Sequence, residues 1–269
     1  MIKLGPAGVP VSSKDRSTVG GIKRAAELSL GAMEVEFVRG VSMSDPTAKK
    51  VGNAAKEAGI DLSVHCPYYI NLCSAEEEKI AASKKRILDS AERADAMGAM
   101  IIVFHPGFYG KLKKEDAFEM VEGACSEMAD KVRDNDWKVL LGLETTGKVS
   151  QFGTLEEIMD ISRKIKECVP VVDFAHIYAR AQGRIDYGDV LDKVRGYKHL
   201  HSHFSCIEYS KGGERRHLTL DANEPDFREL AEEILKRKQD ITIISESPVL
   251  ERDSLKMKSV FEELGYGFE

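Results

Sequence analysis

The chain has 269 residues, of which 42% are hydrophobic and 31% are charged, a balance that is typical of a folded globular protein and excludes extensive disorder. The N-terminal stretch MIKLGPAGVPVSS has no basic region followed by an apolar run, and no segment approaches the ~20 apolar residues that span a bilayer. We therefore expect a soluble cytoplasmic protein. The net charge of −6 gives no overall attraction for a polyanion, so a nucleic-acid partner would require a local basic surface.

Short apolar segments alternate with longer amphipathic ones, which is typical of repeated βα units around a parallel sheet. Helical spacing of apolar residues predicts the intervening helices, for example over 75–98 and 115–134. Eight units in 269 residues average about 34 residues each, the size expected of a (β/α)8 TIM barrel. We predict a single α/β domain of this kind over 1–269. The predicted strands are, in chain order, 2–8, 32–37, 61–67, 100–106, 138–144, 169–176, 198–204 and 241–247.

Side chains that can bind metal stand at the ends of six consecutive predicted strands. In a TIM barrel these C-terminal ends converge on the active site. Imidazole and carboxylate groups at one depth form a ligand set suited to zinc, manganese or iron. They outnumber the four positions of one zinc ion, so two or more ions are expected, with Glu144 as the candidate bridge. The set comprises His65, His105, Glu144, Asp173, His176, His201 and Glu246.

Six short stretches, spread in order over nearly the whole chain, make the sequence resemble the endonuclease IV family of apurinic/apyrimidinic endonucleases. The stretches are HCPYYINL, FHPG, LETTG, VDFAH, LHSHF and SES, which begin at residues 65, 104, 143, 172, 200 and 245. The resemblance implies a TIM barrel with a trinuclear zinc site that cleaves double-stranded DNA 5′ to an abasic site, as base excision repair requires. It also implies that Glu144 orients the attacking hydroxide. A monomer is expected.

The resemblance also implies a role for each ligand. His65 and His105 match terminal ligands of the first zinc, and Glu144 bridges to the second. The second site is then completed by Asp173, His201 and Glu246, and His176 belongs to the third. Among the alternating histidines, the family pattern selects His201, which leaves His199 deeper in the barrel and His203 at a position that is usually Asn.

The third site departs from the family pattern. The family takes an Asp-x-His pair from the loop after strand seven, where this chain reads SKGGERRHLTLD. His217 fits the histidine, but Arg215 stands where the family has Asp. The missing ligand could be Glu214 with a shifted loop, or His203, or the third ion could be weakly bound or missing.

The resemblance assigns substrate contacts to Tyr68, which matches a tyrosine that enters the DNA at the abasic position, and more loosely to Arg39. An enzyme acting on an extruded nucleotide must fill the gap it leaves. Tyr68 could equally be a packed loop aromatic. Cationic side chains in loops after the strands could contact phosphates, or form an ordinary solvated surface. These are Lys111, Lys113, Lys114, Lys148, Arg180, Arg184, Lys211, Arg215 and Arg216.

A different enzyme class fits part of the same residue set. Sugar isomerases and epimerases of the xylose-isomerase-like superfamily hold one ion with a Glu, Asp, His, Glu quartet, which Glu144, Asp173, His201 and Glu246 could form. The pair His65 and His105, which would bind a further ion, favours the nuclease. A catalytically inactive binding protein is the third alternative, since fold alone does not decide function.

Overall fold

The structure, a computed structural model, describes residues 1–268. Its central sheet contains β1 (Ile2–Pro6), β2 (Ala32–Glu36), β3 (Asp61–His65), β4 (Ile101–Phe104), β6 (Leu140–Glu144), β8 (Cys168–Asp173), β9 (His199–Phe204) and β12 (Asp240–Ser245). The eight strands are parallel, in the order β1-β12-β9-β8-β6-β4-β3-β2. The terminal strands β1 and β2 meet through a parallel bridge between Ala7 and Glu34. The sheet is therefore a nearly closed barrel, and the predicted TIM-barrel fold is confirmed.

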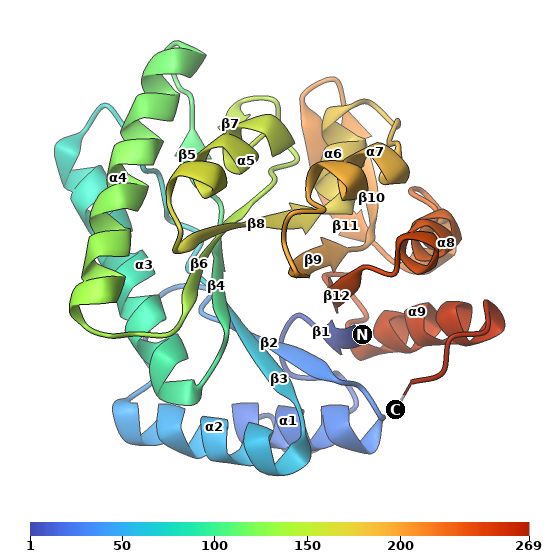
Figure 1. The fold of residues 1–269 in the computed structure, drawn as a ribbon. Helices are drawn as coiled ribbons and strands as arrows, with labels where there is room; N and C mark the ends of the chain where they lie inside the picture. Colours follow the sequence, from blue (N-terminus) through green and yellow to red (C-terminus); the bar gives the residue numbers. More distant parts are fainter. Residues whose placement is uncertain (269) are drawn as a thin grey trace.

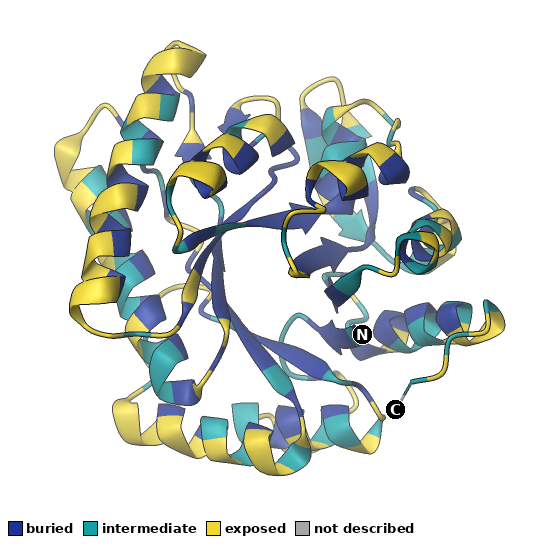
Figure 2. Cartoon of the chain, in the orientation of Figure 1, coloured by how far each residue is buried: buried dark blue, intermediate teal, exposed yellow. Residues whose placement is uncertain are grey.

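Helices surround this barrel (Figure 1). They are α1 (Thr18–Glu27), α2 (Asp45–Ala58), α3 (Glu77–Met97), α4 (Lys114–Asp134), α5 (Leu155–Lys164), α6 (Phe174–Arg180), α7 (Tyr187–Lys193), α8 (Phe227–Arg237) and α9 (Glu251–Glu263). Figure 2 shows buried strands, and helices that are buried on one side and exposed on the other. In α4, for example, Val121, Cys125 and Met128 recur at helical spacing and are all buried. The apolar stripe read from the sequence is thus the face that packs on the barrel.

The sixth predicted strand extends too far. β8 ends at Asp173 and α6 begins at Phe174, so the last three residues of the predicted strand 169–176 are helical. The cause is a helix cap, because the Asp173 side chain accepts a hydrogen bond of 2.7 Å from the backbone N–H of His176. His176 therefore projects from the first turn of a helix.

Short elements stand on the loops at the C-terminal ends of the strands. β5 (Gly107–Phe108) pairs with β7 (Gln151–Phe152), and a hairpin of β10 (Cys206–Ser210) and β11 (Gly213–Leu218) precedes the 3-10 turn η1 (Leu220–Ala222). The hairpin touches the loop after β6 at Gly147. A Cβ atom there would lie 2.6 Å from the Cβ of Glu214, so this close approach requires glycine.

In residues 1–268, none of the helices combines the length and the apolarity needed to cross a membrane.

Candidate metal centre

The first group of potential ligands joins β3, β4 and β6 at the mouth of the barrel. His65 ends β3, His105 follows β4 and Glu144 ends β6. The Nε2 atoms of His65 and His105 lie 3.2 Å and 2.8 Å from Glu144 Oε2. Glu144 is fully buried, whereas the His105 side chain is 34% exposed. The three ligand atoms are close enough to share one ion.

The second group uses the other oxygen of the same carboxylate. Glu144, Asp173, His203 and Glu246 offer ligand atoms within reach of one ion. His203 Nδ1 lies 3.1 Å from Glu144 Oε1 and 3.3 Å from Glu246 Oε1. Glu144 thus presents Oε2 to the first group and Oε1 to the second, the orientation that a carboxylate shared between two ions needs.

In this geometry His203, and not the expected His201, lies with Glu144, Asp173 and Glu246. In the parallel pairing of β8 with β9, Asp173 is level with His203, whereas His201 is level with Val171. Alternate residues of a strand share a face, but each step of two residues moves ~6.6 Å along the strand. His201 therefore lies one step below the mouth, with its Nε2 3.0 Å from Glu34 Oε2.

His199 lies one step further down, at the start of β9, where its Nε2 is 2.9 Å from Thr242 Oγ1. The expectation that His199 is the deepest of the three histidines agrees with this position.

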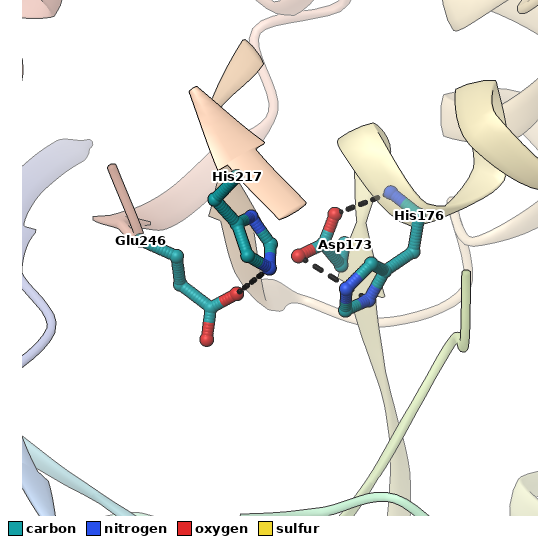
Figure 3. Close-up of side chains that lie close together, drawn as sticks. All are labelled: Asp173, His176, His217 and Glu246. Atoms are coloured by element: carbon teal, nitrogen blue, oxygen red, sulfur yellow. Dashed lines mark hydrogen bonds and ion pairs between the residues drawn. The ribbon is translucent and has the colours of Figure 1, made fainter. Parts of the chain in front are cut away.

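The third group combines a helix and a hairpin that lie outside the barrel sheet (Figure 3). His176 projects from α6 and His217 from β11, and their ring centroids are 5.3 Å apart. His176 Nδ1 is 3.4 Å from Asp173 Oδ2, and His217 Nε2 is 3.6 Å from Glu246 Oε2. The four side chains offer ligand atoms near enough to hold an ion. Asp173 and Glu246 belong to both this group and the second.

A β-bulge explains how the hairpin reaches the site without the family aspartate. Glu208 pairs with Arg216 and the next residue, Tyr209, pairs with Glu214, so Arg215 is an extra, unpaired residue. Residues three apart in a regular strand point to opposite faces, and one extra residue restores a common face. Glu214 and His217 therefore both face His176.

The two neighbouring side chains point in different directions. Glu214 Oε2 lies 3.6 Å from His176 Nε2. Arg215 is 62% exposed and pairs with Glu208 at 3.2 Å, outside the site. His203, the other alternative for the missing ligand, lies in the second group. Of the alternatives, Glu214 is the one whose carboxylate lies beside His176.

Burial and charge in this cluster fit bound cations. Burial would raise the pKa of Glu144, but His105 and His203 outweigh it and hold that pKa well below its usual value. Burial raises the pKa of Glu246 to about 8, against the attraction of His203 and with repulsion from Glu144. Asp173 Oδ2 and His176 Nε2 are buried without hydrogen-bond partners. Cations would satisfy both atoms and offset the crowded carboxylates.

Two carboxylates on β2 were absent from the ligand set expected from the sequence. Glu34 is fully buried, and Glu36 has a buried oxygen, Oε1, without a hydrogen-bond partner. Burial raises the pKa of Glu36 to about 7, although His65 lowers it. The signal was available in the segment AMEVEF. A parallel strand is buried on both faces, so two alternating glutamates must be buried on one common face, although the segment alone does not say whether that face is the barrel interior.

The expected substrate residues lie on neighbouring loops. Tyr68 is 66% exposed, and Arg39 is exposed too. The Tyr68 backbone N–H donates to Val38 O at 3.4 Å, which ties the loop after β3 to the loop that carries Arg39. Arg180 differs from the other cations because its Nη1 donates to Thr146 Oγ1 at 3.0 Å and to a backbone oxygen of the same loop at 2.9 Å. It holds a loop in place and is less available to a ligand.

Comparisons with known proteins agree with this architecture. A family model described as xylose isomerase-like TIM barrel matches residues 22–262. An uncharacterised protein of Methanocaldococcus jannaschii is 39% identical over 276 aligned positions, which cover 98% of each chain. A probable endonuclease 4 of Mycoplasma mobile is 26% identical over 217 residues, 76% of this chain and 75% of that one. Among solved structures, a D-tagatose 3-epimerase-like protein superposes with a TM-score of 0.74 at 21% identity, covering 97% of this chain and 96% of that chain.

The similarity between this chain and the epimerase-like structure is one of fold alone. The endonuclease 4 relative confirms the resemblance to endonuclease IV that the sequence motifs indicated. The match over residues 22–262 includes all the potential ligands described above. The chain belongs to the xylose isomerase-like TIM barrel family.

Proposed function

We propose that the chain is a metal-dependent endonuclease that cleaves double-stranded DNA on the 5′ side of an abasic site. The observation that carries the proposal is the group of His65, His105 and Glu144, which adds a second ion site to the second group through a shared carboxylate. A one-metal sugar isomerase or epimerase needs no such addition. The motifs that resemble endonuclease IV and the endonuclease 4 relative support the same function.

The residues divide among three proposed ion sites. The first site would be held by His65, His105 and Glu144, the second by Glu144, Asp173, His203 and Glu246, and the third by Asp173, His176, His217 and Glu246. Glu214, whose Oε2 lies 3.6 Å from His176 Nε2, would add a further carboxylate beside the third site. Bound zinc or manganese would supply an activated water and neutralise charge on the phosphodiester. Glu144, at the junction of the first two sites, would orient the reacting groups.

Substrate binding must overcome the negative charge of the chain. The buried carboxylates would repel a phosphodiester unless cations occupied the site. Exposed lysines and arginines on the loops at the mouth, among them Lys111, Lys148 and Lys211, would contact phosphates. Tyr68 and Arg39 would fill the space left by the extruded abasic nucleotide. Such recognition does not depend on base sequence.

The direct test is incision of a duplex that carries one abasic analogue. The metal-loaded protein should cut 5′ to the lesion and leave a 3′ end that a polymerase extends. The same duplex without the lesion is the control substrate. No incision at low salt by protein with at least two bound ions would contradict the proposal.

A one-metal sugar epimerase is the second candidate, because Glu144, Asp173, His203 and Glu246 form a complete quartet for one ion. In that role Glu144 and Glu246 would act as acid and base on either side of a ketose. The two functions differ at His105, which the epimerase does not require. Ketose epimerisation that persists in His105→Ala, together with no incision by the wild type, would favour the epimerase.

A further inference from the structure

A fully buried carboxylate on β2 faces β9 across the barrel interior, below the proposed ion sites. Glu34 Oε1 lies 2.9 Å from His203 Nε2, and Glu34 Oε2 lies 3.0 Å from His201 Nε2. The hydroxyl of Ser63 donates to the same Oε2 atom at 2.7 Å. All four side chains are buried. Neither the family resemblance nor the three ligand groups of the proposed nuclease account for Glu34.

His203 stands between two sets of carboxylates. Its Nε2 faces Glu34, and its Nδ1 faces Glu144 at 3.1 Å and Glu246 at 3.3 Å. A neutral imidazole carries one N–H and one lone pair, and the partner of one nitrogen decides which form is present. A histidine that binds a metal usually donates the hydrogen of its other nitrogen to a carboxylate or carbonyl.

We propose that Glu34 is a positioning residue, which accepts the Nε2 hydrogen of His203 and so directs the Nδ1 lone pair to the ion shared with Glu144, Asp173 and Glu246. The inference rests on the metal centre of the proposed function, and it holds for either a nuclease or an epimerase.

The surroundings of Glu34 restrict its movement. Glu34 pairs with Ser63 in the register of β2 and β3, and its backbone oxygen accepts a hydrogen bond of 2.9 Å from Gly8 N–H, next to the bridge that closes the barrel. Ser63 and His201 engage one carboxylate oxygen and leave the other for His203. The carboxylate is thus fixed by side chains of β3 and β9, and the backbone of Glu34 by Gly8.

The same cluster could instead hold an ion of its own, with Glu34, His201 and His203 as ligands. Of the two contacts, that of His201 with Glu34 Oε2 is a formed hydrogen bond of 3.0 Å. Glu34 Oε1 and His203 Nε2 lie 2.9 Å apart without an aligned hydrogen bond, and neither atom has another partner. Because Ser63 and His201 already occupy Glu34 Oε2, we assign Oε1 to the Nε2 hydrogen of His203, and a separate ion becomes an outcome of the test.

The first experiment measures zinc affinity of the metal-free full-length protein by competition with a chromophoric chelator. Glu34→Gln keeps the volume of the side chain but can present either an amide oxygen or an amide N–H to His203. The variant therefore no longer fixes which ring nitrogen of His203 carries the hydrogen. We expect one zinc site to weaken ~10–100-fold while the other sites keep their affinity. Unchanged affinity at every site would overturn the inference.

A matched control separates this effect from a general loss of stability. Glu251 is also a buried carboxylate, and it accepts hydrogen bonds from the backbone N–H groups of Val11 and Ser12. Glu251→Gln should lower the melting temperature without changing zinc affinity. If Glu251→Gln weakened zinc binding as much as Glu34→Gln, the specific role of Glu34 would be refuted.

A second measurement needs no variant at Glu34 and covers the case that Glu34→Gln does not fold. In the zinc-loaded wild type, ¹⁵N NMR of labelled histidines should show His203 protonated at Nε2 and coordinated at Nδ1. Coordination at Nε2, alone or with Nδ1, would overturn the inference and favour a separate ion beside Glu34. A wild type that binds no zinc would refute both this inference and the metal centre, whereas zinc binding without DNA incision would refute only the nuclease.

Discussion

Two pairs of histidines at the mouth of the barrel are built in different ways. His65 and His105 come from the end of a barrel strand and from the residue directly after one. His176 and His217 come from a capped helix and a bulged hairpin outside the sheet. The first pair depends only on the barrel, whereas the second depends on a helix cap, a bulge and the glycine at position 147. Ligands in this fold can thus be supplied by the barrel itself or by its loops.

The largest expected effect is in the first pair. His105→Ala should reduce incision of abasic duplex by at least about 100-fold. Losing a metal ligand should cost more than losing a residue that only hydrogen-bonds to a ligand, which costs ~10–100-fold. Metal analysis should find fewer ions than in the wild type. His199→Ala, a histidine that bonds Thr242 low in the barrel, should keep the ions and the activity. Full incision by His105→Ala would remove this residue from the site.

Removal of the metal should reveal the raised pKa of His65, one histidine of this first pair. Burial opposes a charged His65, but the bond to Glu144 outweighs it and raises the pKa of His65 to about 10. The folded metal-free protein therefore retains a proton that the unfolded chain releases above pH ~6.5. The free energy of unfolding should fall between pH 6.5 and 10, by up to ~1.4 kcal/mol per pH unit. Urea unfolding with and without zinc measures this, and a fall of equal size with zinc bound would contradict it.

Recognition can be separated from the metal sites at the loop that follows His65. Tyr68→Ala should weaken binding to abasic duplex by roughly tenfold to a hundredfold, since stacking is worth ~1–3 kcal/mol. Metal content should stay constant, because the exposed ring contacts solvent and ligates nothing. Binding assays with intact and abasic duplexes provide the comparison. Wild-type affinity for the abasic duplex in this variant would return Tyr68 to a packing role.

The second pair should be more dispensable. His217→Ala is expected to empty one ion site, leave the other two filled and lower incision by about tenfold, because this histidine does not contact the shared Glu144. Metal analysis and incision kinetics check the two effects independently. If neither changed, His217 would not belong to the site.

The smallest effect is expected from deleting Arg215. The deletion removes the bulge residue and leaves Glu214 and His217 two positions apart, so a regular strand would keep both on one face. Metal content should stay within the error of the wild type. Replacing Glu214 with Ala is the contrasting change and should weaken one site. Loss of an ion on deleting Arg215 would show that the bulge itself is needed.

The order of the amino acids is enough to predict the eight βα units and their polar strand ends, because apolar periodicity reports which residues must be buried in each local segment. Which histidine of β9 lies level with the carboxylates depends instead on how the strands pair in three dimensions. Strand alternation gives the face of His201 and His203 but not their height, which depends on the register of β9 against β8. The inward position of Glu34 depends on the pairing of β2 with β3, which are distant in sequence. The bulge at Arg215 depends on how the residues of β11 pair with those of β10 across the hairpin. A local sequence pattern contains neither kind of information.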